Sequence, residues 1–305
     1  MTSLTLFALI DHRGQRPEAR LFRRTPARAA VAVSVALAMG LVPSAARTQP
    51  TRTPDVQFVP TPMAVVDTML AVARVTKDDR LYDLGSGDGR IVITAAKRYG
   101  TRGIGIDIDP QRITDSRKNA DTAGVTQLVE FRQADLFETD LRDATVVTLY
   151  LLPQLNVKLR PKLFAELRPG TRVVSHAFDM GDWPADSVIY VGGRTVYFWR
   201  MPSNVQGTWT LTAPVGGADR TYELRLEQKY QRVTGTATSG GHPVSVEGAR
   251  IVGDSVMFTL MGAEGGSTRP EEQRLRLAGR LNADAMTGAV TGTAGQWRAT
   301  RRPNR

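Results

Sequence analysis

The chain has 305 residues, of which 41% are hydrophobic, and a formal net charge of +10 at pH 7. It contains no cysteine, which excludes disulfides, a cysteine nucleophile and a lipid-modified cysteine. The positive charge lies toward the two ends, because residues 54–203 contain nineteen Lys and Arg against nineteen Asp and Glu. A formally neutral central region argues against a groove that tracks phosphates, so no nucleic-acid partner is expected.

The N-terminus has the pattern of a secretory leader. Four arginines between positions 20 and 28 precede an apolar run at residues 29–42, and small residues follow at 44–46. As a helix, that run spans about 21 Å, less than the roughly 30 Å hydrocarbon core of a bilayer. We therefore expect residues 1–46 to be a signal peptide or an N-terminal anchor. This expectation places the protein in the periplasm or at the inner membrane, in association with the membrane or envelope. An anchor that leaves the remaining chain facing the cytoplasm is a further alternative.

The segment Leu81–Arg90 is the most informative part of the sequence. A short apolar run contains Asp83 and leads into three glycines at alternate positions, Gly85, Gly87 and Gly89. The apolar pattern resumes in residues 91–96, which predicts a helix after the turn. A strand, a glycine turn and a helix in this order present backbone groups to a nucleotide-like ligand.

The spacing of the glycines separates two cofactors. A dinucleotide fold needs Gly-x-Gly-x-x-Gly, whereas here the third glycine comes one residue early. Asp83 and Asp88 flank the turn and would repel a diphosphate, but they suit a ligand with positive charge. S-adenosylmethionine (SAM) carries a sulfonium and an ammonium and no phosphate. The acid-x-Gly-x-Gly-x-Gly turn resembles the first motif of class I SAM-dependent methyltransferases.

The next two expected strands also end near acids. Asp107 closes the strand 103–107, twenty residues after Gly87, where a carboxylate can reach ribose hydroxyls. Asp109 before Pro110 is expected to cap the next helix. Asp135 follows the strand 128–132; an acid at this point meets the adenine amino group in this superfamily, and a loop cap is the alternative. The alternation of strands and helices predicts a parallel sheet built from crossovers.

A closer resemblance appears when the segment Phe58–Pro62 is included. An aromatic-Val-Pro segment, an entry helix with apolar residues from Val65 to Val75, and the glycine turn together resemble one group of seven-strand methyltransferases. This group consists of the protein-lysine methyltransferases similar to those that modify the ring subunit of mitochondrial ATP synthase. The resemblance continues through Tyr150–Gln154 and covers about residues 55–200. The chain departs from the group in having Asp rather than Glu at 107 and in its additional C-terminal part.

The resemblance implies an α/β Rossmann-like domain with a mostly parallel sheet and a terminal antiparallel hairpin. It implies SAM as the cofactor and a protein lysine as the favoured acceptor, with a small molecule as the alternative. The matching positions then nominate seven cofactor-binding residues: Thr61, Asp83, Gly85, Gly87, Gly89, Asp107 and Asp135.

Candidates for the chemistry come from the ends of the fourth and fifth strands. In this fold the end of the fourth strand faces the methyl group, which nominates Tyr150 and Pro153 as catalytic residues. A buried strand aromatic is an equally good explanation of Tyr150. His176, at the end of the fifth strand, is the third candidate. The other two histidines lie in the leader and in the C-terminal part, so no metal site is expected.

From residue 207 onward the pattern changes to short alternating strands separated by turns with Gly, Asp and Asn. Eight strands are expected, at residues 208–211, 222–226, 232–236, 244–246, 255–260, 274–277, 289–291 and 296–300. They predict an antiparallel barrel or sandwich with the texture of small lipocalin-like barrels. We expect Trp209 and Trp297 to fill its core rather than to line a ligand cavity.

The expected organisation is a leader at 1–46, a methyltransferase domain at 55–203 and a β-barrel or sandwich domain at 207–301. The predicted function is a SAM-dependent methyltransferase. A non-catalytic exported binding module with a relic SAM fold is the rival hypothesis, because SAM is made and kept in the cytoplasm. The sequence makes no prediction of the oligomeric state.

Overall fold

The computed structural model describes residues 56–262, 274–292 and 294–303. The expected leader at 1–46 lies outside the described residues. In the part of the chain that is described, none of the helices combines the length and apolar character needed to cross a bilayer.

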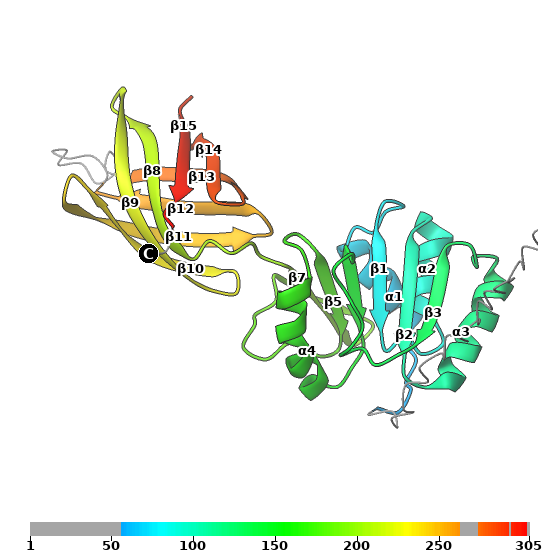
Figure 1. Cartoon of the computed structure of the whole chain (residues 1–305). Coiled ribbons are helices and arrows are strands. Elements are labelled where there is room, and N and C mark those ends of the chain that lie inside the picture. The colour runs from blue at the N-terminus through cyan, green and yellow to red at the C-terminus, as the bar shows by residue number, and fades with distance from the viewer. Residues whose placement is uncertain (1–55, 263–273, 293, 304–305) are drawn as a thin grey trace, which may run out of the picture. The chain divides into compact units, whose positions relative to one another are not determined.

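The first part of the described chain is an α/β sandwich around one sheet of seven strands (Figure 1). Its elements are α1 (Met63–Val72), β1 (Arg80–Leu84), α2 (Arg90–Tyr99), β2 (Arg102–Asp107), α3 (Pro110–Ala123), β3 (Val129–Gln133), β4 (Val146–Leu149), α4 (Pro153–Glu166), β5 (Arg172–His176), β6 (Ser187–Val191) and β7 (Arg194–Arg200). The strand order is β3-β2-β1-β4-β5-β7-β6; β7 pairs antiparallel with β5 and with β6, and the other neighbouring strands pair parallel. The expected parallel sheet with a terminal antiparallel hairpin is confirmed.

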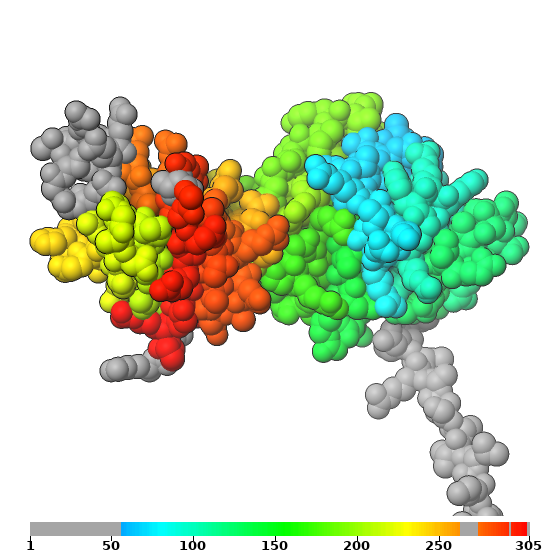
Figure 2. All heavy atoms as spheres, turned by 90° about the horizontal axis from the view of Figure 1, so that it is seen from above, coloured from blue at the N-terminus to red at the C-terminus, as the bar shows by residue number. Residues whose placement is uncertain are grey.

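Helices cover both faces of this sheet and form two apolar cores. One core contains residues of α1, α2 and α3, and the other contains residues of α4. Because both faces are covered, β4 is buried at every position and β1 at all but its first. Figure 2 shows the residues of α1 and α2, in blue and cyan, next to one another on the surface of this part.

The helix ends follow from local sequence signals. The expected cap of α3 is confirmed, because the backbone N–H of Gln111 donates to Asp109 Oδ1 at 2.8 Å and Pro110 occupies the first helical position. The entry helix is shorter than expected and ends at Val72. Arg74 adopts a left-handed backbone (φ 48°), and the chain then returns Val75 to the core as a loop residue.

The C-terminal strands form a closed antiparallel barrel (Figure 1). They are β8 (Gly207–Val215), β9 (Ala218–Lys229), β10 (Arg232–Ser239), β11 (His242–Val252), β12 (Ser255–Met261), β13 (Arg274–Asn282), β14 (Ala285–Val290) and β15 (Gln296–Arg301). All eight expected strands are present. Pairing of β15 with β8 closes the sheet, which decides for a barrel over a sandwich.

The barrel interior is packed with side chains. Trp209 is 0% and Trp297 is 2% exposed, and both belong to the apolar core of the barrel. Each indole N–H donates to a backbone carbonyl: Trp209 to Val205 at 2.9 Å, and Trp297 to Ala278 at 3.1 Å. The expectation that the two tryptophans fill the core is confirmed. The lipocalin-like identity of the barrel stays a prediction.

The turn between β9 and β10 packs against the α/β part. Tyr230 lies 6.0 Å from Trp183 and 5.5 Å from Phe164 between ring centroids, beside the core that contains α4. The Trp183 indole N–H donates to Gln231 Oε1 at 3.0 Å, and Lys229 forms an ion pair with Asp182 at 3.0 Å. The barrel therefore contributes an aromatic side chain to the packing of the α/β part.

Candidate active site

A pocket lies at the carboxyl ends of β1, β2 and β4, the edge at which open α/β sheets bind ligands. It includes the point between β1 and β4 where the strand order reverses. Six of the residues predicted from the sequence line this pocket: Thr61, Asp83, Gly85, Asp107, Asp135 and Tyr150.

The turn between β1 and α2 requires its three glycines. Gly85, Gly87 and Gly89 have φ values of 81°, 55° and 79°, in the left-handed region that disfavours other residues. A Cβ at Gly87 would also lie 2.2 Å from the ring of Phe58. The turn thus allows another segment, or a ligand, to approach the main chain closely. The side-chain oxygen of Ser86 in this turn is buried and has no hydrogen-bond partner among the described residues.

Asp83 is the most deeply buried acid of the pocket, with 2% exposure. The Thr148 hydroxyl donates to Asp83 Oδ1 at 2.7 Å. Burial raises the pKa of the Asp83 carboxyl to about 7, although the Thr148 hydrogen bond lowers it, and the negative charges of Asp107 and Asp88 raise it further. A carboxylate in this environment favours a cationic ligand and disfavours a phosphate.

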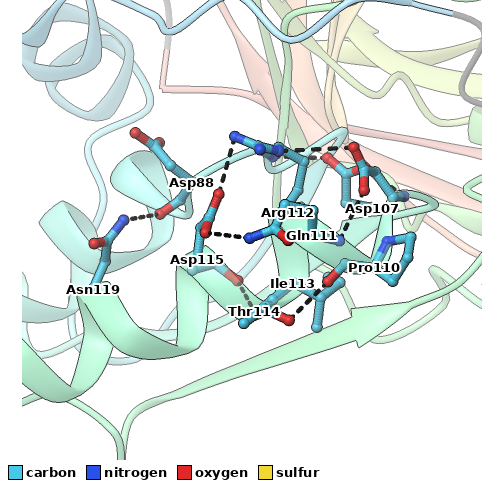
Figure 3. A network of polar contacts seen from close by, with 12 residues as sticks. Asp88, Asp107, Pro110, Gln111, Arg112, Ile113, Thr114, Asp115 and Asn119 are labelled. Atoms are coloured by element: carbon cyan, nitrogen blue, oxygen red, sulfur yellow. Dashed lines mark hydrogen bonds and ion pairs between the residues drawn. The ribbon is translucent and has the colours of Figure 1, made fainter.

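Asp107 connects the end of β2 to the glycine turn. Its Oδ2 accepts from the backbone N–H of Gly87 at 2.8 Å, and its Oδ1 accepts from that of Asp109 at 3.0 Å. Burial raises the pKa of Asp107, whereas these hydrogen bonds lower it. Figure 3 shows Asp107 beside the start of α3; farther along this helix, Asn119 donates to the backbone carbonyl of Asp88 at 3.0 Å. The hydrogen bonds from Gly87 and Asp109 fix the carboxylate at the pocket wall, and its contact with ribose stays a prediction.

Asp135 lies in the segment after β3. Its Oδ1 accepts from the backbone N–H of Phe137 at 2.8 Å, so the loop-cap interaction considered from the sequence is present. Asp135 also lines the pocket, and its contact with adenine stays a prediction.

The candidates for the chemistry lie at the ends of β4 and β5. The rings of Tyr150 and His176 are 3.9 Å apart between centroids, and the ring of Phe178 stacks on Tyr150 at 6.3 Å. His176 is 1% exposed, and its pKa is lowered to about 4, first by burial and then by the charge of Arg194. Its imidazole is therefore neutral near pH 7.

Pro153 is not among the residues that line this pocket. It is exposed and occupies the first position of α4. A backbone N–H at this position has no partner within the helix, so proline loses no helical hydrogen bond there. Its catalytic role stays a prediction.

Phe58, Arg90 and Arg112 are among the pocket residues that were not predicted from the sequence. Phe58 and Arg112 line the pocket, and the Arg112 guanidinium lies 4.9 Å from the centroid of the Phe58 ring. Arg90 forms an ion pair with Asp88 at 2.6 Å and donates to the backbone carbonyl of Thr61 at 2.8 Å. The sequence signal for Arg90 was its place directly after the glycine turn. A small residue usually occupies that position, because the helix packs closely against the strand there.

Comparison with known proteins agrees with this geometry. Residues 83–187 match the family model of the ANTKMT methyltransferase domain, and this match ends before the first barrel strand. A "Protein-lysine N-methyltransferase" of Saccharolobus islandicus (strain REY15A) is 46% identical over 151 residues, which are 48% of this chain and 94% of that protein. The "Adenine nucleotide translocase lysine N-methyltransferase" of Mus musculus is 35% identical over 144 residues, 47% of this chain but only 62% of that protein.

Among solved structures, a crystal structure described as an RNA methyltransferase from Salinibacter ruber in complex with S-adenosyl-L-homocysteine is 61% identical in sequence. It covers 48% of this chain and 96% of its own, with a TM-score of 0.48.

Proposed function

Since the chain belongs to the family of protein-lysine methyltransferases that use SAM, we propose that it methylates a lysine side chain of another protein. The observation that carries the proposal is the arrangement of the pocket. Buried and half-buried acids line the cofactor end, and the Tyr150–His176 pair lies beside it at the ends of β4 and β5. The chain is a SAM-dependent methyltransferase, and the proposal concerns its acceptor.

The pocket fits this cofactor by three observations. Asp83 offers a buried carboxyl that a cation would stabilise in its charged form. The glycine turn lets a ligand meet the main chain, and the buried Ser86 hydroxyl has no partner among the described residues. Asp107 and Asp135 line the walls that the ribose and adenine would contact.

When bound, SAM supplies a methyl group made electrophilic by its sulfonium. The chain's own contribution is to position the acceptor and exclude water. The rings of Tyr150, His176 and Phe178 form an aromatic wall at the ends of β4 and β5. Of these three residues Tyr150 lines the pocket, and an acceptor amine that loses its water against this wall would have a lowered pKa. A neutral His176 adds no positive charge that would repel the incoming side chain.

The acceptor can be tested with purified full chain, tritiated SAM and an extract of the host. We expect label in protein, recovered as methyl-lysine after acid hydrolysis, and SAM binding in a calorimetric titration. Label confined to small molecules would replace the protein acceptor with a small one. An absence of both SAM binding and label would support the relic binding module. An Asp107→Ala variant controls for label that does not depend on the cofactor site.

We also propose that residues 1–46 and the barrel hold the enzyme near a membrane or envelope acceptor. The support is the leader pattern and the packed interior of the barrel, which leaves its outer surface for recognition. Fractionation of cells that express tagged chains with and without residues 1–46 tests the location. Recovery of both forms in the cytosol would contradict it.

A further inference from the structure

The segment Phe58–Thr61, which we call the entry strap, lines the cofactor pocket and leads into α1. At its first residue, the Phe58 ring lies against the glycine turn, since a Cβ at Gly87 would be 2.2 Å from it. The Arg112 guanidinium at the start of α3 lies 4.9 Å from the same ring. The entry strap therefore contacts both the glycine turn and the start of α3, which border the cofactor end of the pocket.

The last residue of the entry strap is fixed by two polar contacts. Thr61 is 3% exposed, and its Oγ1 lies 3.2 Å from His176 Nδ1. Its backbone carbonyl accepts from Arg90 Nη1 at 2.8 Å, and Arg90 is held by its ion pair with Asp88. One short segment is thus connected to the glycine turn and to the end of β5.

His176 meets the strap with one edge and Tyr150 with its face. Nδ1 contacts Thr61, and the ring centroid is 3.9 Å from that of Tyr150. Nε2 is buried and has no hydrogen-bond partner among the described residues. The following residue, Ala177, has a left-handed backbone (φ 66°), which is uncommon without a glycine and marks a locally strained end of the strand.

We infer that His176 is a positioning residue that acts through Nδ1: it holds the entry strap over the cofactor pocket and fixes the ring of Tyr150. This inference rests on the proposed function for its meaning in catalysis, but the contacts concern the cofactor pocket itself. His176 is accordingly not the group that takes the proton from the acceptor.

The chemistry of the imidazole supports this assignment. Burial and Arg194 lower the pKa of His176 to about 4, whereas an unperturbed lysine ammonium has a pKa of about 10.4. Transfer of the proton from an unperturbed ammonium to His176 would be unfavourable by about a millionfold, and a lowered lysine pKa would reduce this factor. A neutral imidazole can still form the hydrogen bond with the Thr61 hydroxyl in either tautomer.

Amide substitutions distinguish the two nitrogens of the ring. In His176→Asn the side-chain amide lies near the position of Nδ1, and in His176→Gln it reaches toward that of Nε2. Thr61→Ser keeps the hydroxyl, and Thr61→Val removes it with little change of shape. The matched control is Thr68→Val on α1, whose hydroxyl bonds only to the backbone carbonyl of Ala64 among the contacts described.

The measurement is the dissociation constant of SAM for the full chain by calorimetry, with circular dichroism to confirm folding. Loss of one hydrogen bond predicts affinity about 5- to 10-fold weaker in Thr61→Val and in His176→Gln. His176→Asn and Thr61→Ser should bind SAM within about threefold of the unchanged chain. The double variant Thr61→Val/His176→Gln should bind about as weakly as either single variant, because both remove the same contact.

Two results would overturn the inference. The first is unchanged SAM affinity in Thr61→Val. The second is retention of affinity in His176→Gln with loss in His176→Asn, which would assign the role to Nε2. A proton-accepting role predicts unchanged SAM affinity but lower kcat at saturating SAM in both His176 variants. These binding measurements need no acceptor, so an absence of protein methylation would contradict the proposed function while leaving the positioning role to be decided by them.

Discussion

Replacement of Asp83 by asparagine should make the cofactor-free protein more stable at neutral pH and weaken its binding of SAM. The Asp83 carboxyl is 2% exposed, and its pKa is raised from 3.8 to about 7, mainly by burial. A rise of about three units corresponds to about 4 kcal/mol of unfavourable free energy for the charged form. Below about pH 4 the carboxyl is protonated in the folded and unfolded chain alike, and this cost is absent.

As the pH rises, the unfolded chain loses this proton first, so Asp83 destabilises the folded state progressively until its folded pKa near 7 is passed. Asp83→Asn removes the titration and keeps an oxygen that can accept from Thr148. The free energy of unfolding of the variant, minus that of the unchanged chain, should therefore increase by about 4 kcal/mol between pH 4 and pH 8. Urea denaturation without SAM at each pH measures this difference, in which the titrating groups that do not interact with Asp83 cancel.

The same variant should bind SAM more weakly at pH 8, because a neutral amide cannot compensate the charges of the sulfonium and ammonium. In the unchanged chain, SAM affinity should rise with pH through 7, whereas in the variant this rise should be absent. Asp121→Asn, at an exposed position on α3, is the matched control. A stability difference that does not change with pH, or equal SAM affinity in both proteins at pH 8, would refute the reasoning.

The other predictions concern the remaining parts of the site and its support. Asp107→Ala should weaken SAM binding by about 1–3 kcal/mol in calorimetry, as expected for a lost charge-assisted hydrogen bond, while NAD fails to bind to either protein. Gly87→Ala should displace Phe58 and impose a left-handed backbone on alanine, and so lower SAM affinity at least tenfold in the same assay; unchanged affinity would mean that the turn tolerates a Cβ. Tyr230→Ala should lower the unfolding temperature of the α/β part, because it removes an aromatic ring from the packing of Trp183 and Trp199. The near-ultraviolet signal of these two tryptophans measures this temperature, and a loss of barrel signal alone would contradict the prediction.

The parts of the fold that the sequence predicted are those whose signals are local. The glycine turn, the cap at Asp109 and the eight barrel strands each depend on a few consecutive residues. Strand β11 was predicted only at residues 244–246, although it extends over His242–Val252. A bulge between Glu247 and Arg250, with Gly248 at φ 59°, interrupts the alternation of apolar and polar residues. The sequence pattern therefore stops although the strand continues.

The parts that could not be predicted depend on contacts between distant segments. Thr61 and His176 are 115 positions apart, and no local pattern in either segment predicts their hydrogen bond. The position of Phe58 against Gly87 likewise exists only after α1 has packed on the sheet. The glycine at 288 also has a reason outside its own segment: a Cβ there would lie 2.0 Å from the carbonyl oxygen of Ala278 in the neighbouring strand.

The strand order has a consequence for how enzymes of this kind diversify. The acids and the glycine turn at the pocket come from β1, β2 and the segment after β3, on one side of the sheet. The aromatic wall formed by Tyr150, His176 and Phe178 follows β4 and β5, toward the other side. Substitutions at Tyr150 or Phe178 can alter the second side and leave the acids and the glycine turn in place, whereas His176 is coupled to the pocket through Thr61. Selection can therefore vary part of the second side while it retains the first.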